Sequence, residues 1–285
     1  MSARPLQLLA ALLAIPALVW ATRLLAGTPP LILAGAAGPA AIYAGLLCRA
    51  QRGEHRPAGL LAAAFLWGAI GAAFLAQVTN DLARHYVATL AGAGQARGLT
   101  ATLVAPAIEE GAKAAGLLLL VLIQPKAIAG PRDGIVYGAL VGVGFVLTEN
   151  LLYLAFAVLQ GGAAGLARGV YLRALLAGGN HAVFTATVGA GIGCARAAAT
   201  RRRRVRAVLV AIAAALLQHL AWNAVAAEAM TRALCGAAIP GASCRPTPAA
   251  GDLFLVVPLL VAVFLAPGGG VLLLLAARDA RRATA

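Results

Sequence analysis

The clearest shortage in this sequence is charge. Only 11% of the 285 residues are Asp, Glu, Lys or Arg, whereas 62% are hydrophobic and the mean hydropathy is +0.89. Charged residues make up about a quarter of an ordinary soluble domain, so this chain has too few of them to cover a soluble surface of its size. The shortage excludes a soluble globular protein.

Short alternating segments of polar and apolar residues, which a membrane β-barrel would show, are lacking as well. The hydrophobic residues form continuous runs of a length that lets an α-helix cross a hydrocarbon core about 30 Å thick. We therefore predict an all-α fold, a polytopic transmembrane helical bundle of about eight spans. The predicted spans are 6–26, 30–48, 58–78, 99–123, 134–159, 173–195, 207–227 and 253–276.

Several signatures of other protein classes are missing. There is no His-Glu-x-x-His pair, no Cys-x-x-Cys and no internal repeat, and "GVGF" at 142–145 lacks the third glycine of a dinucleotide fingerprint. The net charge of +14 and the arginine run at 201–204 could suggest a nucleic-acid partner. Basic residues also gather in the cytoplasmic loops of membrane proteins, and we expect no nucleic acid.

Basic residues in the loops indicate the orientation of the bundle. With the N-terminus inside, the inside segments hold about twice as many Lys and Arg residues as the outside segments. We therefore predict that both termini and the 196–206 loop are cytoplasmic and that the 228–252 loop is outside. The first span should be retained rather than cleaved as a signal peptide, because it is long and lacks a clear small-x-small cleavage site.

The four cysteines agree with this orientation. Cys235 and Cys244 fall in the predicted outside loop, where a disulfide can form, whereas Cys48 and Cys194 fall at inside ends and should stay reduced. Residues 79–98 are predicted to be an outside segment, with a short helix at the membrane interface.

Acidic residues are scarce, yet three of them lie inside predicted spans. Glu109 and Glu110 are in the fourth span and Glu149 in the fifth, and the sixth and seventh spans contain His181 and His219. Counted along antiparallel helices at about 1.5 Å per residue, all five lie roughly 12–15 Å below the outer face. Because ionisable residues inside a membrane generally face the bundle interior and mark function, we predict a catalytic site built by spans four to seven.

Neighbouring polar residues support the predicted site. Lys113 follows Glu109 by four residues and can lie over one of the two adjacent carboxylates, which offsets part of its desolvation. Asn223 follows His219 by four residues and can orient the imidazole, whereas Asn150 points about 100° away from its neighbouring glutamate. A glycine stripe in the fifth span would let another helix approach closely. It consists of Gly134, Gly138 and Gly142.

At these residues the sequence resembles the PrsW family of intramembrane proteases. The pattern is Glu-Glu-x-x-Lys at 109–113, Phe-x-x-x-Glu-Asn at 145–150, and then a His on each of two later spans. The likeness covers roughly residues 99–227, which we expect to form the protease core. Residues 1–98 would then hold spans one to three and an outer loop, and residues 228–285 the outer loop with the cysteine pair and the final span.

The resemblance implies a hydrolase of the bacterial cytoplasmic membrane, related to the CAAX prenyl endopeptidases. Family members are viewed as cleaving membrane-anchored proteins, the best known being an anti-sigma factor, and they have been grouped as metalloproteases. The implied partners are the lipid bilayer and a substrate protein with a single membrane span.

Two chemistries fit these residues. In the first, a glutamate activates water directly and the two histidines hold the water and the oxyanion, without a metal. In the second, Glu149, His181 and His219 bind Zn²⁺, with an open position for water and another glutamate as the base. The predicted catalytic residues in either case are Glu109, Glu110, Glu149, His181 and His219, with Lys113, Asn150 and Asn223 in support.

Two other classes of protein also fit ionisable residues buried in a membrane. A proton-coupled transporter would use them, although it usually shows repeated halves, which this sequence lacks. A non-catalytic membrane scaffold could keep an inherited site. For a protease, the depth of the site predicts that a substrate is cut near the extracytoplasmic end of its span.

Overall fold

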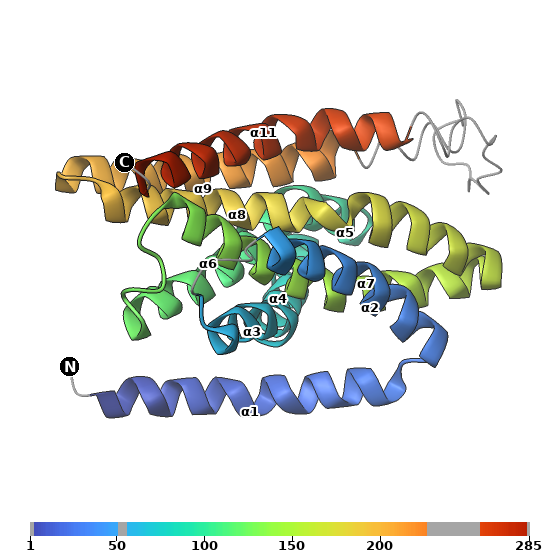
Figure 1. Cartoon of the computed structure of the whole chain (residues 1–285). Helices are drawn as coiled ribbons and strands as arrows, with labels where there is room; N and C mark the ends of the chain where they lie inside the picture. The colour runs from blue at the N-terminus through green and yellow to red at the C-terminus, as the bar shows by residue number, and fades with distance from the viewer. Residues whose placement is uncertain (1–2, 51–55, 227–256, 284–285) are drawn as a thin grey trace.

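The computed structural model describes residues 3–50, 56–226 and 257–283, and this part of the chain is almost entirely helical, with no strand in it (Figure 1). The α-helices are α1 (Ala3–Gly27), α2 (Pro30–Ala50), α3 (Ala58–Leu66), α4 (Ala73–Ala91), α5 (Ala93–Leu99), α6 (Ala105–Ile123), α7 (Pro131–Gly169), α8 (Asn180–Ala197), α9 (Arg201–Ala221) and α11 (Val257–Ala283). Wider π-helical turns are η1 (Trp67–Ala72), η2 (Thr100–Val104), η3 (Val170–Leu176) and η5 (Trp222–Ala226), and η4 (Ala177–Gly179) is a 3₁₀ turn.

Five helical stretches within the described residues are long and apolar enough to cross a membrane: Pro30–Arg49, Ala58–Ala91, Pro131–Ala197, Arg201–Ala224 and Val261–Arg278. Helix α6 is not one of them, and it contains Glu109, Glu110 and Lys113. The all-α fold and the membrane-spanning character predicted from the hydrophobic runs are confirmed.

The 67-residue stretch Pro131–Ala197 is a hairpin and not a single rod. The chain turns back at Gly161 and Gly162, whose backbone leaves helical geometry, with φ of +56° at Gly162. That left-handed conformation suits a residue without a Cβ atom. The reversal makes α7 and α8 antiparallel neighbours.

The glycine stripe of α7 forms the contact between the two legs of this hairpin. A Cβ atom added at Gly134, Gly138 or Gly142 would lie 1.9–2.5 Å from a backbone oxygen of α8, contributed by Gly189, Thr185 and His181 respectively. Such distances allow only glycine, so the close helix approach predicted from the stripe is confirmed. The approach also fixes the height of His181 relative to Gly142.

Helix α7 is the central element of the bundle. It packs against α8, α2, α3 and η1, while α9 packs on α8, and α11 packs on α8 and α7. In Figure 1, α1 runs along the outer side of the bundle, and the start of α1 and the end of α11 lie at the same end. Residues 227–256, including Cys235 and Cys244, lie outside the described residues, so their predicted disulfide stays a prediction.

The segment predicted to leave the membrane at residue 79 is helical for a further three turns. Helix α4 continues to Ala91 and ends at Gly92, which has a φ of +83°. Within it, Asp81 accepts hydrogen bonds from Gln77 at 2.8 Å and from Arg84 at 2.9 Å. These contacts join side chains three or four residues apart, which are neighbours on a helix surface, so polar residues here extend the helix instead of ending it.

Candidate active site

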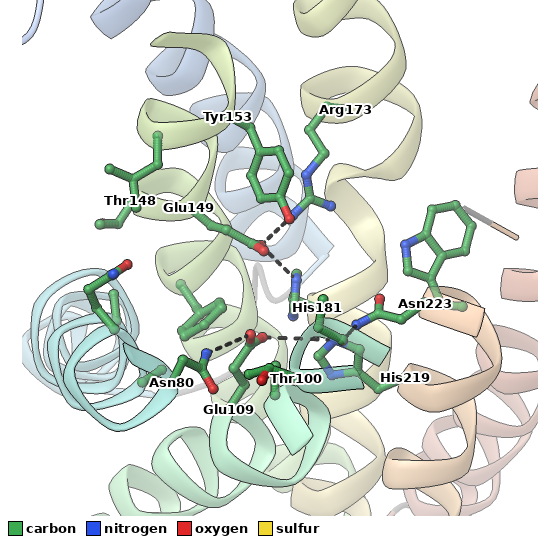
Figure 2. A pocket seen from close by; sticks show the side chains of 18 of the residues that line it. Asn80, Thr100, Glu109, Thr148, Glu149, Tyr153, Arg173, His181, His219 and Asn223 are labelled. Atoms are coloured by element: carbon green, nitrogen blue, oxygen red, sulfur yellow. Dashed lines mark hydrogen bonds and ion pairs between the residues drawn. The ribbon is translucent and has the colours of Figure 1, made fainter. Parts of the chain in front are cut away.

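Four of the five ionisable residues selected from the sequence line one cavity of about 530 Å³ (Figure 2). They come from different helices: Glu109 on α6, Glu149 on α7, His181 on α8 and His219 on α9. Glu110 lies behind the two histidines, with only 3% of its surface exposed. The shared depth counted from the sequence therefore corresponds to a shared site.

Irregular helical turns flank three of these residues. The π-helical turn η2 leads into α6 one turn before Glu109, η3 precedes the short turn before His181, and η5 begins three residues after His219. A π-helical turn is frequent at functional sites because it shifts the side chains that follow out of the regular helical register. Each of these helices thus changes geometry near the cavity.

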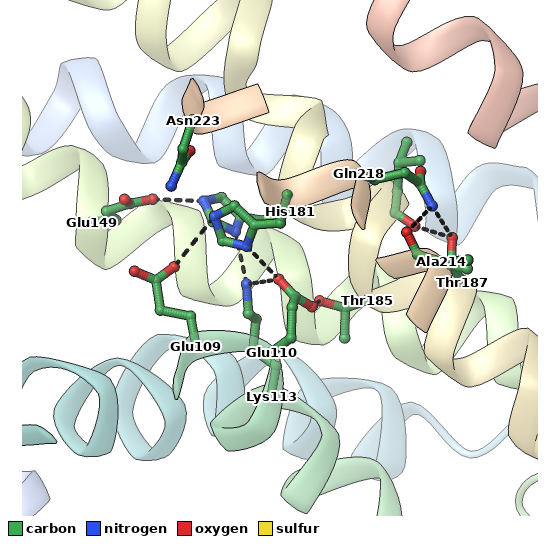
Figure 3. A network of polar contacts seen from close by, with 12 residues as sticks. Glu109, Glu110, Lys113, Glu149, His181, Thr185, Thr187, Ala214, Gln218 and Asn223 are labelled. Carbon is green, nitrogen blue, oxygen red and sulfur yellow. Dashed lines mark hydrogen bonds and ion pairs between the residues drawn. The ribbon is translucent and has the colours of Figure 1, made fainter. Parts of the chain in front are cut away.

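A buried network around Glu110 holds both imidazoles (Figure 3). The Oε1 atom of Glu110 lies 2.6 Å from Nζ of Lys113 and 3.0 Å from Nδ1 of His219, and Oε2 accepts a hydrogen bond from Thr185 at 3.3 Å. Nζ of Lys113 is also 2.7 Å from Nδ1 of His181. The pairing of Lys113 with Glu110, three residues away, replaces the contact with Glu109 expected from the four-residue spacing.

The hydrogen-bond partners determine which nitrogen of each imidazole has the proton. A lysine ammonium only donates, so Nδ1 of His181 accepts and the proton is on its Nε2, which lies 2.8 Å from Oε2 of Glu149. Nδ1 of His219 donates to the carboxylate of Glu110. Nε2 of His219 is then left as an acceptor on the cavity side.

Glu149 is held by an arginine that lies in the membrane-spanning part of the chain. Arg173 forms an ion pair with Oε2 of Glu149, and its guanidinium lies 4.5 Å from the ring centroid of Tyr153. Both Arg173 and Tyr153 line the cavity (Figure 2). Arg173 is the first residue of the predicted span 173–195 and was not among the predicted site residues, yet its side chain is only 19% exposed and belongs to the site.

Glu109 is the carboxylate with an uncommitted oxygen. Its Oε1 atom accepts a hydrogen bond from Asn80 at 3.4 Å. Its Oε2 atom is buried without a hydrogen-bond partner among the described residues, and Nε2 of His219 lies 3.8 Å from it. This oxygen lies where it can accept a proton from a molecule in the cavity.

Aromatic rings fix the positions of the imidazoles. The ring of Phe184 stacks on His219 with centroids 4.9 Å apart, and Phe145 lies 5.1 Å from His181. The Nζ atom of Lys113 is 4.3 Å above the ring of Phe145. An apolar wall of this kind strengthens the polar contacts behind it, because it keeps water from them.

The two supporting asparagines have separate partners. Asn223 lines the cavity, but its side chain donates to the backbone oxygen of Ala101 at 2.9 Å and does not hold His219. Asn150 is buried, with 1% of its surface exposed, and its Oδ1 atom has no hydrogen-bond partner among the described residues.

The donor atoms at the cavity fit a zinc ion. Glu109, His181 and His219 each offer one ligand atom, and these atoms lie within 4.8 Å of one another. One carboxylate and two imidazoles are a common ligand set for catalytic zinc, and the contact of Glu110 with His219 is the kind that orients a metal-binding imidazole. Glu149, which we grouped with the histidines from the sequence, is instead engaged by Arg173. Binding through Nε2 of His181 would require its proton to move to Nδ1 and Lys113 to turn away.

Buried carboxylates and imidazoles around a cavity, inside an apolar bundle, define a membrane-embedded hydrolytic site. Comparison with known families agrees. A family model described as PrsW family intramembrane metalloprotease matches residues 56–265, which is more than half of the chain. The chain belongs to this family and is an integral membrane protein. No curated protein and no solved structure gave a match.

The family match extends beyond the motifs that resemble the family in sequence. It begins at the start of α3 and ends within α11, whereas the motifs span roughly 99–227. Among the added residues, Asn80 on α4 hydrogen-bonds Glu109, and Trp67 in η1 donates to the backbone of Ala112, the residue before Lys113 on α6, at 3.1 Å.

Proposed function

We propose that the protein is an intramembrane endopeptidase that hydrolyses a peptide bond in a substrate with a single membrane span. Membership of the PrsW family supports an intramembrane protease in general. The observation on which the proposal rests is the free Oε2 atom of Glu109, which is buried at the cavity wall and lies opposite the acceptor nitrogen of His219.

In the proposed mechanism Glu109 is the general base. A water molecule in the cavity would give one proton to Oε2 of Glu109, while its other proton is held by Nε2 of His219, so that its oxygen lone pair points at the substrate carbonyl. Arg173 lines the cavity beside Glu149. Its guanidinium has several N–H groups and can stabilise the negative charge that develops on the carbonyl oxygen.

The remaining residues position the reacting groups. Glu110 and Lys113 hold the two imidazoles by one contact each in the metal-free chemistry, and with zinc the contact of Glu110 with His219 would remain. A zinc ion, when bound, would be held by Glu109, His181 and His219 and would polarise the water and the carbonyl.

The finer features of the proposal come from the sequence. The chain would cross the membrane about eight times, with a catalytic unit over 99–227 and both termini in the cytoplasm of a bacterial cell. The family resemblance suggests an anti-sigma factor as the substrate, cut near the extracytoplasmic end of its span.

Cleavage of a single-span reporter by the purified protein in lipid nanodiscs tests the proposal. The Glu109→Gln variant should lose cleavage by a factor of 100 or more, because a general base contributes about 10²–10⁴-fold. Asp133→Asn is the matched control, since Asp133 forms an ion pair with Arg56 at 2.6 Å and does not line the cavity. Full activity in Glu109→Gln would refute the role of the base, whereas no cleavage by the unaltered protein would favour a transporter or scaffold. Metal content, and activity with and without a chelator, would separate the two chemistries.

A further inference from the structure

A second cavity, of about 760 Å³, shares no lining residue with the active site. Helices α9 and α11 each pack on α8, and the cavity is a groove lined by all three helices. The lining residues of α9 recur every three or four positions, so one face of this helix forms one wall. They are Arg203, Arg206, Ala207, Val210, Ala211, Ala214 and Gln218.

The chemistry of this groove changes along its length. Arg203 and Arg206 line one end, and both are exposed, with no ion-pair partner among the described residues. The middle is apolar and is lined by Val210 on α9 and by Val271 and Leu272 on α11. None of the described residues that line the groove is acidic, so the charge of these lining residues at its arginine end is positive.

The dimensions of the groove correspond to one leaflet of a membrane. From Arg206 to Gln218 the helix rises about 18 Å at 1.5 Å per residue. One leaflet accounts for about 15 Å of a hydrocarbon core about 30 Å thick. A pair of arginines placed at the interface would therefore continue into an apolar channel that ends near the middle of the bilayer.

The first turns of α9 also have a charge pattern that disfavours the helix. Thr200 caps α9 by accepting a hydrogen bond from the backbone of Arg203 at 3.4 Å, and arginines occupy positions 201–204 and 206. The amino end of a helix has a partial positive charge, so cations there are unfavourable and an anion is favourable. A bound anion would relieve this conflict.

We propose that this groove binds an anionic phospholipid, with its phosphate at Arg203 and Arg206 and an acyl chain along Val210 and Leu272. Charge complementarity selects the headgroup, and the apolar walls of the groove select the chain. This site is independent of the peptidase function proposed above.

Native mass spectrometry of the full-length protein, delipidated in detergent and titrated with phosphatidylglycerol or phosphatidylcholine, tests the proposal. The protein should bind phosphatidylglycerol about tenfold more tightly than phosphatidylcholine. The double variant Arg203→Gln/Arg206→Gln should weaken phosphatidylglycerol binding about ten- to thirtyfold, since each basic residue near an anionic lipid contributes a factor of roughly five.

The matched control is Arg202→Gln/Arg204→Gln, which removes the same charge from the same run. Neither residue lines the groove, and Arg204 donates to the backbone oxygen of Ala198 at 3.0 Å. This control should keep phosphatidylglycerol binding within about threefold. An equal loss in both double variants would show a diffuse attraction and would overturn the proposal.

A second pair of variants tests the acyl-chain channel. Ala214→Trp should fill the groove and weaken phosphatidylglycerol binding, whereas Leu217→Trp, at a residue 66% exposed and outside the groove, should not. Unchanged binding in Ala214→Trp would refute the channel.

Displacement of the lipid by inorganic phosphate at equal concentration would show a plain anion site. Displacement by an uncharged apolar helical peptide would show a site for any apolar segment. Either result would contradict the proposal.

Discussion

Lys113 is the cation on which the buried network depends. It is fully buried and contacts both Glu110 and His181, so it neutralises one carboxylate and sets the tautomer of one imidazole. The sequence showed that Lys113 belongs to the site, but it could not select the partner. On a helix, residues three and four positions away are both within reach, and only the packing of Thr185 and His219 against Glu110 decides between the two glutamates.

Replacing Lys113 should therefore damage stability as well as activity. We expect Lys113→Met to lower the free energy of unfolding by about 3–5 kcal/mol, because it leaves the carboxylate of Glu110 buried and unpaired. The double variant Glu110→Gln/Lys113→Met removes both charges and should recover most of the thermal midpoint in detergent, but not the cleavage of a reporter. If the double variant were less stable than Lys113→Met, the ion pair would not be the cause of the loss.

Arg173 is a site residue that was not predicted from the sequence. Its position near a predicted helix end made it look like a loop cation, yet it lies eight residues before His181, about two helical turns along the same segment. An ionisable residue within a turn or two of a predicted site is the signal that would have found it. Asn80 and Tyr153 gave no such signal, because polar and aromatic residues are ordinary near membrane interfaces.

Arg173 should be required for turnover and should tolerate a change only to another cation. We expect Arg173→Met to lower the turnover number about 100-fold, as for loss of one oxyanion donor, and Arg173→Lys to recover part of it. Arg84→Met is the control, because Arg84 also lines the cavity but pairs with exposed Asp81. Similar losses in Arg173→Met and Arg84→Met would indicate a general effect of charge at the cavity.

At the scale of elements, the α7–α8 hairpin sets the geometry of the site. Glycines at intervals of four residues predicted a close partner for α7, and the partner is α8. The partner's identity follows from the turn at Gly161 and Gly162, which reverses the chain inside a long apolar run. The predicted spans 134–159 and 173–195 already required a reversal between them, and the glycine pair lies in that interval.

A single methyl group in this contact should disturb the site. In Gly142→Ala the new Cβ atom would lie 2.2 Å from the backbone oxygen of His181, so α8 must shift. We expect a loss of about 1–3 kcal/mol of stability from overpacking, together with a larger loss of cleavage activity. Gly111→Ala is the control, because its Cβ atom would meet no atom within 4 Å. Thermal denaturation and reporter cleavage measured on both variants would check this. If Gly142→Ala kept the thermal midpoint and the cleavage activity of the unaltered protein, the role of the contact would be refuted.

At the scale of the whole molecule, the question is how the bundle is oriented in the membrane. The start of α1 and the end of α11 lie at the same end of the bundle (Figure 1), which agrees with two termini on one side of the membrane. The side itself was predicted from the basic loops, because a bundle without its bilayer has no inside or outside. Apolar composition predicted the bundle well, whereas helix contacts such as those of α7 depend on side chains far apart in the sequence.

Cysteine labelling of intact cells and of opened membranes should establish the side. In a cysteine-free background, a cysteine at position 202 should react only after the membrane is opened, and one at position 240 should react in intact cells. The positive-inside bias gives the physical reason, and the two positions serve as controls for each other. The reverse pattern would invert the bundle and move the predicted cut to the cytoplasmic side.

The size of the active-site cavity has a consequence for what the protein can cut. One turn of an α-helix with its side chains, 10–12 Å wide and 5.4 Å long, fills about 400–600 Å³, and the cavity measures about 530 Å³. The cavity therefore has room for about one helical turn of a substrate, and the peptide groups of an intact helix are shielded by their own hydrogen bonds. A few residues must first unravel, which is costly in a bilayer but less so where Gly or Pro weakens the helix. Ease of local melting, more than any side-chain pattern, would then decide which proteins are cut and where.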